Sequence, residues 1–359
     1  MNFTFSDEQE MLRDSAREFL QSKYPVERVA EIADGEGFDP SSWSEVAELG
    51  WTGISLPEDA GGAGMSFLEE MVVIEELGRA VYPGPFFSTV VLALPALSLA
   101  PELLESVVAG KSAATLAWAG ADGRFEADGL AVRADGDRLS GTALFVPDLA
   151  VADQVVVAAQ GDSGAGLWLV ERDGEGASWE DLPTVDTTRR LGALTLSNAP
   201  GRVLAEPGSG GAVLERIRDR ALAALAVEAV GVADRALSFT VEHAKTRQQF
   251  GRPIGVFQAV SHKLADAYVE VENARSLAYY AGWAVANEAG EASQAAVGAK
   301  GYAADAAVDV CEKAIQAHGG IGFTWEHPLH RFYKRALWIS AFMGWPSAQR
   351  ARIAAELIG

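Results

Sequence analysis

The segment from Arg247 to Gln258, RQQFGRPIGVFQ, gathers side chains that could hold a nucleotide. Arg247 offers a planar fork of N–H donors that suits pyrophosphate oxygens, glutamine amides can pair with ribityl or phosphate groups, and Phe250 offers a face for a ring. Gly251 breaks a helix and Pro253 blocks its resumption, so the sequence predicts a junction between two helices here. Capping and packing alone would explain this segment equally well.

A second cluster, from Gln316 to Glu326, reads QAHGGIGFTWE. The helix before it ends in a Gly-Gly-x-Gly loop, and glycines let backbone N–H groups approach a ligand closely, which suits an adenine nucleotide as well as a sharp turn. Either cluster alone would be weak evidence. Together, in this order and on successive helices, they indicate that the chain binds a nucleotide.

Other catalytic chemistries lack a signature in this sequence. It contains no H-E-x-x-H, paired C-x-x-C, Walker loop or G-x-S-x-G element. The histidines of the C-terminal half have no metal-ligand spacing, so we expect structural or surface roles and no metal site for His243, His262, His318 and His327. The single cysteine, Cys311, argues against an internal disulfide, and its helical surroundings predict a small core hydrophobe.

The composition argues against nucleic acid and anionic membranes as partners. A formal net charge of −21 over 359 residues is opposite to the basic surface that binds phosphates. The opening residues, MNFTFSDEQE, lack the basic and apolar run of a secretory signal, so we expect a cytoplasmic protein. The most apolar stretch, Phe86 to Ala100, is shorter than the roughly 20 residues of a membrane span and predicts a buried helix.

The elements that must position these residues change in type twice along the chain. The N-terminal part predicts helices, one starting at a capping box formed by Ser6 and Gln9, another running from Phe67 to Gly78. Short apolar runs from Thr115 to about Leu204 predict strands and hairpins, with turn signals at Asp122-Gly123, Asp135-Gly136 and Asp173-Gly174.

After a glycine cluster the helical period returns and persists to the end. Long alanine-rich runs suit a four-helix bundle, at about 212–245, 258–287 and 293–317. The sequence therefore predicts an α+β protein of three domains: an all-helical domain at 1–112, a β-domain at 113–207 and a helical bundle at 208–359.

At these residues the chain resembles the acyl-CoA dehydrogenases over nearly its whole length. The resemblance is carried by SDEQEMLRDSAREFL, by GWTGISLPEDAGGAGMSFLEEMVVIEELGRA and by VGVADRALSFTVEHAKTRQQFGRPIGVFQ. It implies a helical domain, a β-barrel-like domain and a four-helix bundle, assembled as a tetramer with FAD bound across a dimer interface. By analogy, the residues that reach into a neighbouring subunit's FAD are Arg247, Phe250, Gln258, Gln316 and Gly320.

The resemblance also implies the chemistry of the family, in which an acyl-CoA thioester loses an α-proton to a base and a β-hydride to the flavin. The usual base is a glutamate in a Tyr-Glu-Gly-Thr stretch, and the matching stretch here, AFMGWPSAQR, has Met343 at that position. A second position used by some members falls near Ala221. Neither side chain can accept a proton, although the backbone N–H of Met343 could still polarise a thioester oxygen.

The β-domain departs from the family pattern as well. The Trp-Ile-Thr strand, which lies against the flavin ring in the family, appears here as FVPD, from Phe145 to Asp148. Pro147 has no N–H to donate, and a threonine hydroxyl is missing. Arg335 stands where the family usually has an acidic residue. The half of the site that would hold the chain's own flavin ring is therefore altered.

This pattern favours the base-lacking subunit of a heteromeric dehydrogenase, in which a second chain of the family carries the glutamate. Such heterotetramers of sterol-degrading bacteria suggest a bulky or branched acyl-CoA as substrate, and the family resemblance implies electron-transfer flavoprotein as the acceptor. Two alternatives stay open. One is an autonomous homotetramer with a relocated base, at Glu228, Asp148 or Asp153; the other is a non-catalytic assembly or docking subunit without flavin.

Overall fold

The computed structural model describes residues 5–358, which form two compact units. Among the described residues, the unit that we call the helical unit comprises 5–31, 67–82 and 222–358. The other, the sheet unit, comprises 32–66 and 83–221. The three-domain division at residues 112 and 207 stays a prediction, whereas the succession of helical, β and helical segments is confirmed.

The N-terminal helices of the helical unit begin where the sequence predicts. Helix α1 (Asp7–Lys23) starts at a complete capping box, since the Ser6 hydroxyl accepts from the Gln9 N–H at 3.2 Å and the Gln9 side chain accepts from the Ser6 N–H at 3.0 Å. Helix α2 (Val26–Asp34) follows, and helix α4 (Phe67–Ala80) is buried along most of its length.

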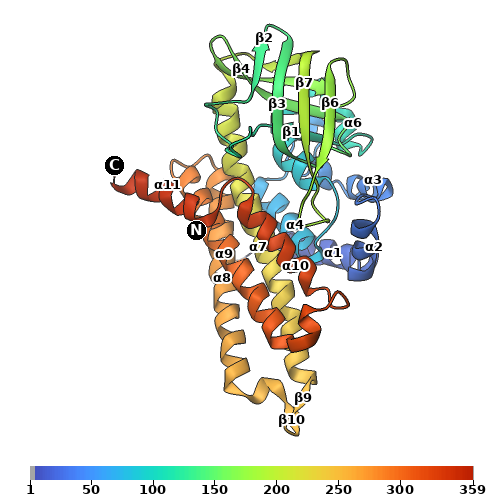
Figure 1. The fold of residues 1–359 in the computed structure, drawn as a ribbon, viewed down its shortest axis with the longest axis vertical. Coiled ribbons are helices and arrows are strands. Elements are labelled where there is room, and N and C mark those ends of the chain that lie inside the picture. Colours follow the sequence, from blue (N-terminus) through green and yellow to red (C-terminus); the bar gives the residue numbers. More distant parts are fainter. Residues whose placement is uncertain (1–4, 359) are drawn as a thin grey trace. The chain divides into compact units, whose positions relative to one another are not determined.

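Long helices make up the C-terminal part (yellow to red in Figure 1), and α8 and α9 run alongside each other. They are α7 (Gly210–Thr246), α8 (Gln258–Ala286), α9 (Ala292–His318), α10 (Leu329–Ala341) and α11 (Pro346–Ile358). The first three match the predicted alanine-rich runs to within two residues at each end. Their small side chains let the helices approach one another closely.

Helices α4 and α7 cross with almost no space between their backbones. A Cβ atom at Gly231 would lie 2.0 Å from the Glu75 carbonyl oxygen, and one at Gly78 would lie 2.4 Å from that of Glu228. Both positions therefore require glycine, because even a methyl group would collide with the backbone of the facing helix.

The sheet unit contains one eight-stranded sheet (green strands in Figure 1) in the order β6-β7-β3-β2-β4-β5-β8, with β1 also paired to β4. The strands are β1 (Ala114–Ala117), β2 (Val132–Asp135), β3 (Arg138–Pro147), β4 (Gln154–Gly161), β5 (Gly164–Glu171), β6 (Ala177–Leu182), β7 (Leu191–Pro200) and β8 (Arg202–Ala205). Its core includes the fully buried Trp168 and Leu139. The end strands β6 and β8 do not pair with each other, so the sheet is open and only loosely barrel-like.

The predicted turns are only partly hairpins. Asp135-Gly136 joins the paired strands β2 and β3, as expected. Asp173-Gly174 does not close a hairpin, because β6 pairs with β7 instead of β5, and Asp122-Gly123 lies in the loop between β1 and β2, which are not neighbours. A turn sequence determines the local reversal of the chain, whereas side-chain packing determines which strand becomes the neighbour.

The apolar stretch at 86–100 is buried, as predicted, but it is not a regular α-helix. A π-helix spans Phe87–Ala93 and continues into α5 (Leu94–Leu97). The sheet unit also contains α3 (Pro40–Glu48) and α6 (Leu104–Val108). Within residues 5–358, no helix combines the length and the apolar character that crossing a membrane requires.

Candidate functional site

A two-stranded hairpin projects where α7 ends and α8 begins. Strands β9 (Gln248–Gln249) and β10 (Arg252–Pro253) pair across a turn whose central residues, Phe250 and Gly251, have φ angles of 54° and 78°. Two successive positive φ angles give a type I′ turn, which suits the twist of a short hairpin. The predicted junction between two helices is confirmed, although α7 already ends at Thr246 and Gly251 lies in the turn of the hairpin. The turn leaves the Phe250 side chain 91% exposed.

The polar side chains of this junction are exposed, and Arg247 and Gln258 keep their donors open. In residues 5–358, the Arg247 guanidinium makes no hydrogen bond or ion pair, and Gln258 is exposed at the first position of α8. Nearby, the Arg252 guanidinium lies 4.7 Å from the centre of the Phe257 ring. Guanidinium and amide donors left open in this way are available to a ligand or a partner subunit.

The second cluster is equally open. Helix α9 ends at His318, and a 3-10 turn (Gly319–Phe323) carries the chain away from it. Gly319 has a φ of 63°, and no atom lies within 4 Å of the position that a Cβ at Gly319 or Gly320 would take. Gln316 and Gly320 are exposed, so the start of this turn is open to solvent.

Stacked imidazoles bring the two clusters together. The rings of His243 and His318 lie 4.2 Å apart, centre to centre, at an interplanar angle of 24°, and His327 lies 4.4 Å from His318. His243 precedes Arg247 by one helical turn, and His318 follows Gln316 by two residues, so the stack joins the ends of α7 and α9. The sequence offers no signal for this contact, because the three histidines come from separate segments.

These imidazoles are neutral at neutral pH. Burial lowers the pKa of His243 and of His318, and the His318 Nδ1 lies 2.8 Å from the Ala314 carbonyl oxygen. Burial, reinforced by the other two histidines, lowers the pKa of His327 to about 4. No group of side chains suited to a metal ion occurs within residues 5–358. The stack is therefore a packing contact between uncharged rings beside the Arg247 guanidinium.

Met343, which the family resemblance predicts at the position of the catalytic glutamate, is buried. Met343, 7% exposed, follows α10 with a φ of 56°, and its carbonyl accepts a hydrogen bond from the Gln349 side chain at 2.8 Å. The buried Lys300 ammonium donates to the Ser340 carbonyl at 2.9 Å and to that of Gly344, and burial lowers the pKa of Lys300 to about 7. The turn is fixed, and the thioether in it cannot take a proton.

The first candidate for a relocated base, Glu228, is committed to an ion pair. Its carboxylate lies 2.5 Å from the Arg335 guanidinium, and both side chains are almost fully buried. Arg335 also donates to the Tyr82 carbonyl at 3.3 Å. This contact explains why an arginine occupies position 335, because it neutralises a buried carboxylate. Protonating Glu228 would leave Arg335 buried and unpaired, which makes it a poor base.

The other two candidates anchor loops of the sheet unit. Asp148 accepts from the Ser88 hydroxyl at 2.7 Å, and Asp153 accepts from the Ala113 N–H at 3.0 Å. Ala221, at the family's second base position, is fully buried. Each carboxylate thus has a structural role.

The altered flavin-facing stretch is irregular. The pairing of β3 with β7 shifts register between Ala143 and Val146, and Phe145 in that bulge has a φ of 56°. The Pro147 carbonyl accepts from the Thr115 hydroxyl at 2.6 Å, while Pro147 itself has no N–H to offer. This stretch therefore does not fit a flavin ring that needs donors, whereas the exposed clusters at Arg247 and Gln316 fit the pyrophosphate and adenosine of a nucleotide.

Comparison with known proteins places this architecture in a family. Residues 6–100 match the family description "Acyl-CoA dehydrogenase, N-terminal domain", and residues 210–358 match "Acyl-CoA dehydrogenase, C-terminal domain". Acyl-CoA dehydrogenase IpdE2 of Mycolicibacterium smegmatis is 32% identical over 98% of this chain and 99% of its own.

Two solved structures are similar to this chain in sequence and in fold. A chain of the Tcur3481-Tcur3483 steroid ACAD G363A variant is 35% identical with a TM-score of 0.89, covering 98% of both chains. A chain of the ChsE4-ChsE5 complex from Mycobacterium tuberculosis is 32% identical with a TM-score of 0.91, covering 100% of this chain and 99% of the other. The chain belongs to the acyl-CoA dehydrogenase family, as its sequence motifs predict.

Proposed function

We propose that this chain is the base-lacking subunit of a heteromeric, FAD-dependent acyl-CoA dehydrogenase, and that it completes the FAD site of a partner chain. The family oxidises acyl-CoA thioesters, and its cofactor is FAD. The finer assignment rests on one observation: the residues expected to hold a neighbour's FAD are exposed and joined by the histidine stack, whereas the base position holds the buried Met343.

The reaction requires a carboxylate that this chain does not present. The α-proton of a thioester is weakly acidic, so a positioned base and hydrogen bonds to the thioester oxygen are both needed. The family resemblance places one base position at Met343 and a second near Ala221, and Glu228, Asp148 and Asp153 all have structural partners. We therefore assign the base to the partner chain.

The location of the two sites within the helical unit supports this division of labour. The loop that follows Gln316 precedes α10, and Met343 follows it, so the two lie at opposite ends of a helix about 20 Å long. Arg247 is joined to the first of these ends by the His243–His318 contact. The residues proposed to bind the neighbour's nucleotide would thus lie near one end of α10, and the chain's own altered acyl site would lie near the other end.

The relatives suggest the substrate and partner classes. Both structural relatives come from structures that name two proteins, Tcur3481-Tcur3483 and ChsE4-ChsE5, and the first of these is named a steroid ACAD. We propose a bulky, ring-bearing acyl-CoA thioester as substrate, a glutamate-bearing chain of the same family as partner, and electron-transfer flavoprotein as electron acceptor. A homotetramer remains the competing assembly.

Co-expression tests the proposal directly. The chain purified alone should be inactive in dye reduction with a panel of acyl-CoA thioesters, and the complex with a glutamate-bearing family chain should be active. Glutamate to glutamine in the partner should abolish that activity. Full activity from the lone chain would instead indicate a relocated base, to be sought by amide substitution of Glu228, Asp148 and Asp153. A colourless complex would indicate a non-catalytic assembly subunit.

A further inference from the structure

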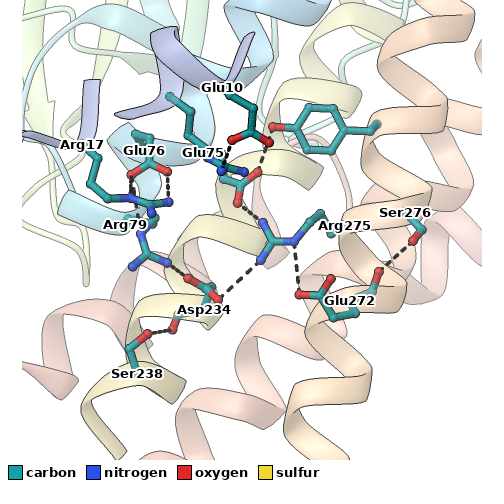
Figure 2. Close-up of polar contacts among 12 residues, drawn as sticks. Glu10, Arg17, Glu75, Glu76, Arg79, Asp234, Ser238, Glu272, Arg275 and Ser276 are labelled. Carbon is teal, nitrogen blue, oxygen red and sulfur yellow. Dashed lines mark hydrogen bonds and ion pairs between the residues drawn. The ribbon is translucent and has the colours of Figure 1, made fainter. Parts of the chain in front are cut away.

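A charge network fastens four helices of the helical unit to one another (Figure 2). Arg17 on α1 makes two bonds to Glu76 on α4, at 3.0 and 2.6 Å, and Arg79 on α4 pairs with Asp234 on α7. On its other side, Arg275 of α8 contacts Asp234 at 3.4 Å and also pairs with Glu75. Guanidiniums and carboxylates alternate through the network, so each of these charges has a partner.

A cleft of about 380 Å³ opens beside this network. Its polar wall carries Arg17, Arg79, Arg235 and Glu76, and its apolar wall carries Leu20, Tyr24, Val26 and Phe239. The space is at the lower end of the range for ligand sites. It suits a small organic molecule and is too small for FAD or coenzyme A.

Arg235 is the one guanidinium of the cleft without a partner anion. In the described part of the chain it makes no hydrogen bond or ion pair, and its guanidinium lies 4.2 Å from the centre of the Phe239 ring. The carboxylates that line the cleft are Glu76 and Glu27. Glu76 attracts Arg235 electrostatically, but it is already bound by Arg17 at two oxygens and lies 3.5 Å from Arg79. The Arg235 guanidinium therefore keeps its N–H donors open toward the cleft.

The cationic groups of the cleft are crowded. Burial, together with the positive charges of Arg17 and Arg235, lowers the pKa of Arg79 to about 10 against the opposing effect of Glu76. Burial likewise lowers the pKa of Arg235, with Arg17 contributing in the same direction. An anion in the cleft would relieve this repulsion, and partial burial would strengthen its attraction to Arg235.

We propose that this cleft binds a small organic oxyanion, a carboxylate or phosphate carried by an apolar group. The Arg235 guanidinium would donate two hydrogen bonds to the oxygens of this anion. The planar guanidinium matches either oxyanion in two parallel hydrogen bonds, and the ring of Phe239 holds it in place. The apolar wall would cover the rest of the ligand. Arg235 lies about 18 Å along α7 from Arg247, so this site is separate from the proposed FAD grip.

Calorimetric titration of the full-length chain tests the site with three probes: phenyl phosphate, benzoate and inorganic phosphate. Saturable binding of phenyl phosphate or benzoate is expected, and the tighter of the two identifies the anion; inorganic phosphate should bind more weakly than phenyl phosphate. R235A should weaken the binding at least tenfold and R235K less, while both variants retain the far-UV circular dichroism of the parent. R216A removes an exposed arginine from the same helix and should leave affinity unchanged.

Absence of saturable binding by all three probes would overturn the proposal. So would an R235A affinity equal to that of the parent, or an equal loss in R216A, because binding would then reflect the general charge of α7. None of these measurements depends on FAD or a partner chain, so failure here leaves the proposed dehydrogenase function untouched.

Discussion

At the scale of single residues, the groups proposed to hold a nucleotide are separate from the position predicted to carry the base. Arg247 and Phe250 are both exposed. Within residues 5–358 the Arg247 guanidinium makes no hydrogen bond or ion pair, and the Phe250 ring meets the Phe257 ring edge-on with their centres 6.0 Å apart. Both side chains are therefore accessible to a ligand or a neighbouring subunit. Met343 is buried in a turn that keeps the backbone held by Gln349 and Lys300. The turn predicted to carry the base is therefore held by hydrogen bonds but has a thioether in place of a carboxylate.

Arg247→Ala should weaken FAD binding by the heteromer at least tenfold, because a charge-assisted hydrogen bond to an ionised group contributes about 1.5–3 kcal/mol. The measurement is the dissociation constant of FAD, from titration of the apo-complex followed by flavin fluorescence. Lys245→Ala, which removes a positive charge from the same end of α7 but pairs only with Glu242, is the matched control. An equal loss of FAD affinity in the two variants would show that Arg247 acts only through its positive charge and not through direct hydrogen bonds to FAD.

Arg335→Met should destabilise the chain by about 3–5 kcal/mol, because it leaves the Glu228 carboxylate buried without its partner. The double variant Glu228→Gln with Arg335→Met should recover most of that loss. Urea unfolding followed by circular dichroism measures both. A single variant as stable as the parent would show that the Glu228–Arg335 ion pair does not stabilise the fold.

At the scale of elements, the sequence predicts the long helices well and their contacts poorly. The alanine-rich period gives α7, α8 and α9 to within two residues, and the Ser6–Gln9 pattern gives the start of α1. Local signals of this kind reside in a few neighbouring residues. The hairpin expected at Asp173-Gly174 is wrong because the choice between β5 and β7 as the neighbour of β6 depends on packing across the sheet.

The candidate site shows the same limit. Its two clusters are visible in the sequence because each places glycines and donors at a helix end. The contact between the two clusters cannot be predicted from the sequence, since His243 and His318 are far apart in the chain and lack any recognisable spacing. The Glu228–Arg335 pair was equally hidden: position 335 could be seen as a departure from the family pattern, but its partner emerges only from the fold.

The crossing of α4 and α7 gives a prediction at this scale. Gly231→Ala should destabilise the helical unit by about 1–3 kcal/mol, because the added methyl group would meet the Glu75 carbonyl oxygen. Gly298→Ala in α9, where a Cβ would make an ordinary 3.6 Å contact with Ile353, should instead stabilise by about 0.5–1 kcal/mol. Chemical unfolding of the two variants under identical conditions compares them, and the same sign for both would contradict the packing of α4 on α7.

The histidine stack that joins the ends of α7 and α9 predicts an acid sensitivity. The pKa of His327 in the fold is about 4, below its ordinary 6.5, so the unfolded chain binds more protons between these values. The contribution of His327 to the free energy of unfolding is therefore fully present above pH 6.5 and is lost as the pH falls to about 4. His327→Gln should flatten the dependence of melting temperature on pH in that window, and an unchanged slope would show that the imidazole is not held neutral.

At the scale of the whole molecule, the central claim is that each heteromer has one kind of complete FAD site, built from the partner's flavin-facing half and the Arg247 grip of this chain. The reciprocal site would use this chain's β3 end, where Pro147 has no N–H and Phe145 lies in a bulge. Two chains that pair in this way share one complete site between them.

The molar ratio of FAD to protein in the purified heteromer tests this claim most directly. Flavin absorbance after denaturation, set against the protein concentration, should give one FAD for each pair of unlike chains, and Arg247→Ala should lower that ratio. The chain expressed alone should retain little flavin. One FAD for every chain, in the heteromer or in the chain alone, would contradict the account.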